Sequence, residues 1–272
     1  MDPRRRILRL STLSVFETSF IAPPVEFSLA NIMMLASRLR FCRLTYNYGR
    51  EEYDIGTGFG HFGLAVNDVY ATSDEVKSKG GIVSREPGPV KGGKTNIAFV
   101  KDPTGYSWEL IERQGEIPEP IAQVMLRVGD LDKSIKFYTE ALGMKLLRTR
   151  ENPEYKYTLA FLGYGDEQSS TVFELTYNWG KDSSNYGKGD AYAQVAISTK
   201  DVFKTAEQIR SAGGTITREP GPVPGIGTKI GSANGCFCFD FYLFNYFHFK
   251  GNIFFICSCM HRSRWLEDCL CR

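Results

Sequence analysis

The chain has 272 residues, of which 42% are hydrophobic and 24% charged, a composition typical of a globular protein with one large or two medium domains. A formal net charge of +2 leaves no excess of basic residues to mark a nucleic-acid surface. No uninterrupted apolar run reaches the about twenty residues that a membrane-spanning helix needs. We therefore expect neither a nucleic-acid partner nor a membrane partner.

The two ends of the chain differ in composition from its middle. The first forty residues are rich in arginine, contain several serines and hold few acids, which is typical of an organelle transit peptide, although an unrelated start fits equally well. Six of the seven cysteines lie after residue 235, and a body without cysteines fits a reducing compartment. The expected location is the cytoplasm or the chloroplast stroma.

An internal repeat organises the middle of the chain. The segment LTYNYG at 44–49 returns as LTYNWG at 175–180, and SREPGPV from Ser84 returns as TREPGPV from Thr217. The offsets are 131 and 133 residues. The sequence therefore predicts a duplication of a unit of about 130 residues.

Strands and helices alternate along this repeat. Residues 61–66 and 123–128 are expected to form strands, and apolar residues at helical spacing follow between Leu131 and Leu142. Gly143 stands where a glycine would end that helix. A third copy begins at Gln194 with a strand, and its helix ends at a Gly-Gly pair.

Each helix is followed by several short β-rich segments, so the predicted module is a strand, a helix and then three strands (βαβββ). One such module cannot bury a core alone. We expect modules to pair into a curved, mostly antiparallel mixed sheet whose concave face holds a ligand, an α+β fold.

The repeat is damaged at both ends. Similarity stops at about Gly231, and the aromatic-rich segment GCFCFDFYLFN stands where a second hairpin should be. The outer modules are therefore predicted to be truncated or replaced. The predicted divisions are a non-family extension (1–40), a truncated first unit (41–116), a truncated second unit (120–230) and a tail interpreted as foreign sequence (231–272).

Four residues are candidates to hold a metal. His61 begins a strand after a glycine-rich turn, and Glu109 lies 48 residues later in an apolar hairpin strand. Gln123 begins the next module, and 51 residues later Glu174 interrupts an apolar strand. A strand histidine alone is often structural, but a buried carboxylate is costly unless a cation accompanies it. This donor set suits an octahedral zinc, nickel, manganese or cobalt ion with open positions.

These residues carry a family resemblance. The segments GFGHFG, DPTGYSWELIER, QVMLRVGDLDKSIKFYTEALGMKLLR and FELTYN resemble glyoxalase I of the vicinal oxygen chelate superfamily, in the two-domain form typical of plants, over about residues 43–230. The resemblance implies a lactoylglutathione lyase that isomerises the methylglyoxal–glutathione hemithioacetal, with glutathione as co-substrate. It implies metal ligands at these positions: His61, Glu109, Gln123 and Glu174.

The resemblance also implies a mechanism. A metal that coordinates the substrate oxygens, zinc or nickel and alternatively manganese or cobalt, stabilises the enediolate formed on proton loss. Glu109 is implied as the principal base, and Glu174 can act from the opposite face.

Four further residues are candidates for binding the substrate. Arg127 follows Gln123 by four residues and shares its strand face, where it could hold a glutathione carboxylate. The resemblance assigns Asn178 to the glutathione moiety. Lys91 and Lys94 lie in the loop PVKGGK and could reach another carboxylate. Each of the four could instead be a surface residue.

The duplication predicts a second site, but its ligands are missing. Arg43 takes the place equivalent to Glu174, and Gln194 takes that of His61. Its remaining glutamate would fall in the tail. One complete site is therefore expected.

Two other interpretations stay open. The chain could be an inactive or regulatory fragment that binds metal or glutathione without turnover, or another enzyme of the superfamily such as an extradiol dioxygenase or an epimerase. A dioxygenase needs two histidines and one carboxylate on iron, and this site offers a single histidine. The family implies a monomer, although exposed sheet edges would permit a homodimer.

Overall fold

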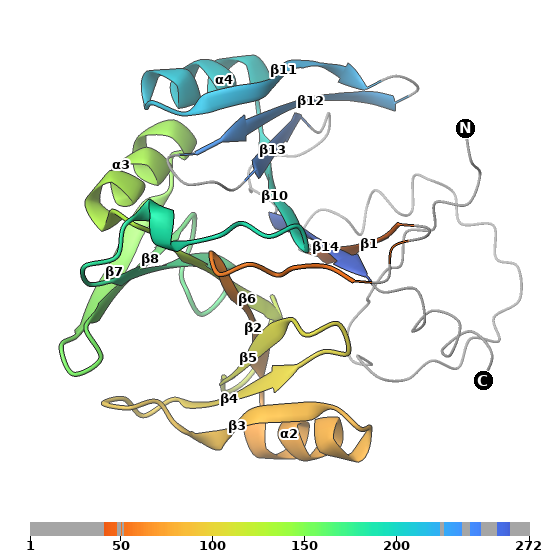
Figure 1. Ribbon diagram of the computed structural model, residues 1–272, viewed down its shortest axis with the longest axis vertical. Coiled ribbons are helices and arrows are strands. Elements are labelled where there is room, and N and C mark those ends of the chain that lie inside the picture. The colour runs from red at the N-terminus through yellow and green to blue at the C-terminus, as the bar shows by residue number, and fades with distance from the viewer. Residues whose placement is uncertain are drawn as a thin grey trace, which may run out of the picture.

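The computed structural model describes residues 41–47, 50, 52–223, 226–235, 240–245 and 255–261. The predicted extension, residues 1–40, lies outside this part of the chain. The described residues form two β-sheets with helices packed against them (Figure 1). Among these residues, no helix has the length and hydrophobicity that a membrane crossing requires.

The larger sheet has eight strands in the order β3-β4-β5-β2-β6-β9-β8-β7. Its strands are β2 (Phe59–Val66), β3 (Ile82–Pro89), β4 (Asn96–Lys101), β5 (Ser107–Glu112), β6 (Ile121–Arg127), β7 (Lys145–Asn152), β8 (Tyr157–Gly163) and β9 (Val172–Asn178). The central strands β2 and β6 pair antiparallel, whereas β2 runs parallel to β5 and β6 runs parallel to β9. With α2 (Val69–Ser78) and α3 (Leu131–Leu142), each half is a βαβββ module. The predicted α+β fold with a curved, mostly antiparallel sheet is confirmed.

The smaller sheet has six strands in the order β1-β14-β10-β13-β12-β11. Its strands are β1 (Phe41–Tyr46), β10 (Tyr192–Thr199), β11 (Thr215–Val223), β12 (Ile226–Asn234), β13 (Asp240–Asn245) and β14 (Phe255–His261). Helix α4 (Val202–Ser211) follows β10 and packs beside α3 (Figure 1).

The third module extends beyond the point where the repeat ends in sequence. The sequence predicts no family strand after about Gly231, but β13 pairs parallel with β10 and antiparallel with β12. Strand β5 pairs with β2 and β4 in the same way. Strands pair through backbone hydrogen bonds, and aromatic residues favour the strand conformation. An aromatic-rich segment unrelated to the repeat can therefore take the place in the third module that β5 takes in the first.

Part of the tail also fills the place of an absent first-module strand. Strand β14 lies between β1 and β10, parallel to β1 and antiparallel to β10. Strand β6 lies between β9 and β2 with the same directions. Of the two options for the outer modules, replacement therefore describes these two strands better than simple truncation.

Local signals in the sequence explain where the helices begin and end. The side chains of Asp68, Asp130 and Asp201 accept hydrogen bonds from the first backbone N–H groups of α2, α3 and α4. Gly143 ends α3 in the left-handed conformation, as predicted. Each helix therefore starts directly after a strand: α2 after β2, α3 after β6 and α4 after β10. Helices α2 and α3 pack against one face of the larger sheet, and its other face is left for a site.

Candidate metal centre

The four predicted ligands come from the four central strands of the larger sheet. His61 lies on β2, Glu109 on β5, Gln123 on β6 and Glu174 on β9. Gly63, two residues after His61, is in register with both Glu109 and Gln123. A Cβ atom at Gly63 would overlap Gln123 Cγ, so a glycine is needed there for the ligands to meet. The structure thus brings the whole predicted set together.

The side chains converge on one point. Glu109 Oε2 lies 3.0 Å from His61 Nε2, and Glu174 Oε2 lies 3.8 Å from it. Gln123 Nε2 lies 2.6 Å from Glu109 Oε2 and 2.7 Å from Glu174 Oε2. All four residues are between 4% and 9% exposed. Donor atoms of the histidine and both glutamates lie within 4.8 Å of one another, a spacing that one ion can span.

The donor set fits a divalent metal. Two buried carboxylates close together repel each other, and burial is costly for both unless positive charge is shared between them. Rotating the Gln123 amide by half a turn presents its oxygen instead of its nitrogen, which supplies another oxygen ligand. One nitrogen and three oxygen donors suit zinc, nickel, manganese or cobalt.

Burial and charge perturb the titration of the cluster. Burial raises the pKa of Glu174 to about 7; the positive charge on His61 opposes this, and nearby Glu109 reinforces it. Burial alone would lower the pKa of His61, but the hydrogen bond to Glu109 and the charges of Glu174 and Glu109 raise it. The metal-free cluster therefore holds protons that a metal must displace.

Aromatic rings border the cluster. The Phe99 ring meets the His61 ring edge-on, with centroids 5.3 Å apart. Phe161 is in register with Glu174, and the Arg148 guanidinium lies 3.4 Å from the centroid of its ring. Apolar walls strengthen electrostatic interactions at the ligands. Sequence reasoning missed Phe99 and Phe161, although both stand opposite a glutamate on the neighbouring strand.

Two of the predicted substrate-binding residues, Arg127 and Asn178, form hydrogen bonds to other parts of the chain. Arg127 Nη1 donates to the carbonyl oxygens of Thr57 and Phe59, each at 2.9 Å, so part of its guanidinium holds the turn before His61. Asn178 Nδ2 donates to the Tyr186 hydroxyl at 2.8 Å.

The two candidate lysines lie on the β3–β4 loop. Lys91 Nζ pairs with Glu154 at 2.5 Å and bonds the Tyr155 hydroxyl at 3.0 Å, both in the β7–β8 turn. Lys94 is exposed on the same loop. Neither lysine belongs to the buried cluster, and their substrate role stays a prediction.

The second half of the duplication offers no equivalent carboxylate at the matching backbone position. Ala196 on β10 is in register with Tyr242 on β13, where Gly63 on β2 is in register with Glu109 on β5. Arg43 is in register with Ser258 of β14. Within the described part of the chain, one buried His/Glu/Glu group has metal-binding geometry.

Paired βαβββ modules around a buried cluster of carboxylates and imidazole define a metal-binding class of α+β protein. Residues 20–110 and 120–231 match the Glyoxalase/Bleomycin resistance protein/Dioxygenase superfamily, and the chain belongs to this family. The first match begins before residue 41, and the predicted boundaries of the units stay a prediction.

Several plant proteins are similar to the chain. It is 68% identical to a probable chloroplastic lactoylglutathione lyase of Arabidopsis thaliana, over 69% of this chain and 53% of that protein. It is 60% identical to a lactoylglutathione lyase of Oryza sativa subsp. japonica, over 70% of this chain and 66% of that protein. The crystal structure of glyoxalase I from Zea mays superposes with a TM-score of 0.72 at 59% identity, covering 75% of this chain and 73% of that one. The chain thus spans about half to two thirds of the curated plant relatives.

Proposed function

We propose that this chain is a lactoylglutathione lyase, a metal-dependent isomerase of the methylglyoxal–glutathione hemithioacetal that yields S-lactoylglutathione. The observation that carries the proposal is the convergence of His61, Glu109, Gln123 and Glu174 on one buried point. Relatives at 60–68% identity that bear the name lactoylglutathione lyase support it. The chain matches only part of the length of these relatives, so we propose their activity for it by similarity.

The four residues would hold one divalent ion, zinc or nickel and alternatively manganese or cobalt. When bound, the ion supplies Lewis-acid stabilisation of negative charge on the substrate oxygens. The reaction is an isomerisation, so it needs no oxidant or reductant. Its demand on the protein is to move one proton between adjacent carbon atoms.

The two glutamates are the groups that move this proton. We assign Glu109 as the principal base, whose carboxylate takes the proton from the carbon beside the carbonyl and returns it to the neighbouring carbon. Glu174 lies across the cluster and can do the same from the opposite face.

Residues outside the buried ligand cluster would bind glutathione, the co-substrate. We assign Arg127 and Asn178 to the glutathione moiety, and Lys91 and Lys94 to a glutathione carboxylate. Binding through Lys91 would require its ammonium group to leave Glu154. An exposed ion pair of this kind is worth little, so a substrate carboxylate can compete for it.

The proposal extends to location and assembly. A chloroplastic relative supports the chloroplast stroma, and the cytoplasm is the alternative. We propose a monomer, because the site draws all of its ligands from one chain.

Replacing Glu109 tests the proposal directly. We expect Glu109→Gln to lower the rate of lactoylglutathione formation by about 10²–10⁴-fold, the usual contribution of a proton-transfer residue, while most of the bound metal persists. The measurement combines an absorbance assay for lactoylglutathione with metal analysis on the same preparation.

The outcomes separate the alternatives. Equal turnover without Glu109 would contradict its catalytic role. A wild-type chain that binds metal but never turns over the hemithioacetal would instead be the inactive or regulatory form. Turnover of a catechol with oxygen would indicate a dioxygenase.

A further inference from the structure

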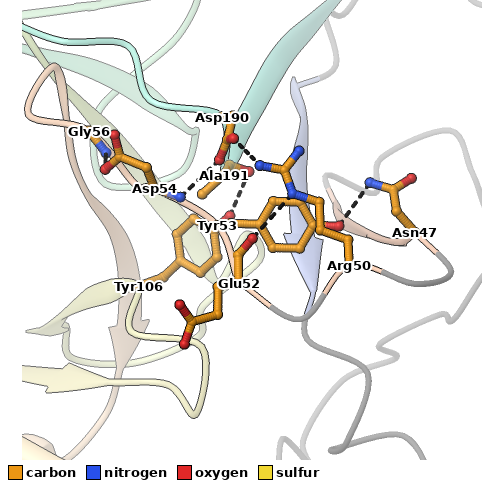
Figure 2. Close-up of polar contacts among 9 residues, drawn as sticks. All are labelled: Asn47, Arg50, Glu52, Tyr53, Asp54, Gly56, Tyr106, Asp190 and Ala191. Atoms are coloured by element: carbon orange, nitrogen blue, oxygen red, sulfur yellow. Dashed lines mark hydrogen bonds and ion pairs between the residues drawn. The ribbon is translucent and has the colours of Figure 1, made fainter.

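The two halves of the duplication are joined where two equivalent linkers cross. Each linker begins at a TYN segment, and the linkers end at His61 and Gln194, which occupy equivalent positions in the repeat. Figure 2 shows the contact between the first linker and residues 190–191 of the second. The second linker belongs to the half that lacks a complete ligand set.

The crossing is nearly symmetric. Backbone N–H groups of Thr57 and Gly58 both donate to Gly187 O at 2.9 Å. Those of Asp190 and Ala191 donate to Asp54 O at 2.7 and 2.8 Å. Each linker therefore binds the other through two backbone N–H groups at equivalent positions of the repeat.

Side chains lock the same crossing. Thr57 Oγ1 accepts a hydrogen bond from Gly187 N at 2.9 Å. At the equivalent position Asp190 Oδ1 accepts one from Asp54 N at 2.8 Å, and Asp190 also pairs with Arg50 (Figure 2). These contacts fix the direction in which each linker leaves the crossing.

Two glycines allow the linkers to approach so closely. Gly56 and Gly189 both have positive φ, +72° and +63°. A Cβ atom on Gly56 would lie 2.5 Å from Gly187 O and 2.6 Å from Gly189 N. No other residue fits here without moving backbone.

The second linker reaches the elements that carry two of the ligands. Gly187 holds the turn at Thr57 and Gly58, directly before β2 and four residues before His61. The Tyr106 hydroxyl donates to Ala191 O at 2.6 Å, and Tyr106 directly precedes β5, three residues before Glu109 (Figure 2). One short segment, residues 187–191, therefore touches the start of both ligand strands.

Packing and a guanidinium complete the support. The rings of Phe59 and Tyr192, which are equivalent in the repeat, stack with centroids 4.7 Å apart and planes inclined by 15°. Arg127 donates to the carbonyls of Thr57 and Phe59 from strand β6, which carries Gln123. The turn before His61 is thus held between the second linker and β6.

We propose that segment 187–191 positions His61 and Glu109 for metal binding, with Thr57 and Tyr106 as the positioning residues. The half without a complete site would then serve the metal centre of the other half. This inference rests on the proposed function, because it assumes that the cluster binds a divalent ion.

The test uses Co²⁺ alone as the probe with the full chain. Thr57→Val keeps the shape of the side chain but removes the acceptor for Gly187 N, and Tyr106→Phe removes the donor to Ala191 O. We expect each variant to weaken Co²⁺ binding about tenfold, the lower end of the range for supporting residues around a metal site, and to change the visible absorption of bound Co²⁺. Thr57→Ser should restore both.

A matched control separates positioning from general destabilisation. Thr217 and Ser232 share a hydroxyl–hydroxyl hydrogen bond of 2.8 Å on β11 and β12 of the smaller sheet. Thr217→Val should leave the affinity and spectrum of Co²⁺ unchanged. If Thr57→Val and Tyr106→Phe also leave them unchanged, the inference is wrong.

A metal-free measurement distinguishes this inference from the proposed function. The imidazole NMR signals of His61, assigned with His61→Gln, should move in Thr57→Val and stay in place in Thr217→Val. If the signals move in Thr57→Val but the wild-type chain binds no Co²⁺, the metal site is contradicted and the positioning role of Thr57 is supported. Unmoved signals would overturn the positioning role.

Discussion

At the scale of single residues, the ligand set was predictable and its surroundings were not. Burying a glutamate carboxylate in an apolar strand costs free energy unless a cation accompanies it, so Glu109 and Glu174 can be recognised from the sequence as candidate ligands. Thr57 carries no such signal, because its partner Gly187 lies 130 residues away in the chain. The same holds for Lys91, whose pairing with Glu154 joins two outer hairpins.

Metal uptake should depend on pH in a defined direction. The folded-state pKa values of Glu174 and His61 are raised above their unfolded values, Glu174 to about 7. Both groups therefore contribute stability that is present at low pH and is lost as pH rises through these values. A metal must displace the same protons, so its affinity rises with pH through about 7.

Thermal unfolding between pH 5.5 and 8 checks this prediction. The rise in Tm produced by saturating Zn²⁺ should be larger at pH 8 than at pH 5.5, and the metal-free chain should lose stability over the same interval. A metal-induced shift that shrinks with rising pH would contradict the proposed ligands.

At the scale of elements, helices and central strands followed from local pattern. Gly143 ends α3 where the sequence predicts it, and the aspartate that accepts hydrogen bonds at the start of each helix is a local signal of the same kind. Strands β13 and β14 could not be predicted from the repeat, because backbone pairing with a sheet neighbour does not require family sequence.

The packing of β2 against β6 gives a prediction of its own. A methyl group at Gly63 would overlap Gln123 Cγ, so Gly63→Ala should displace the Gln123 amide, destabilise the fold by about 1–3 kcal/mol and weaken Co²⁺ binding. Thermal unfolding and a Co²⁺ titration measure the two effects.

Gly88→Ala is the control for this substitution. It also lies on a strand of the larger sheet, but a Cβ atom there meets nothing within 4 Å. It should change neither property. Equal behaviour of the two variants would show that the Gly63 contact is unimportant.

At the scale of the whole molecule, the duplication produces two unequal halves. The larger sheet is complete and carries all four candidate ligands, whereas the smaller sheet has tail strands at two of its positions and an arginine where one ligand would be. The crossing of the linkers gives the smaller half a structural connection to the site. We therefore expect one metal-binding centre for the whole chain.

Metal content of the purified chain tests this central claim most directly. Elemental analysis after dialysis should find about one divalent ion per chain, and the double variant His61→Ala/Glu174→Gln should lose it. A wild-type chain without metal, or a double variant that retains a full equivalent, would contradict the account.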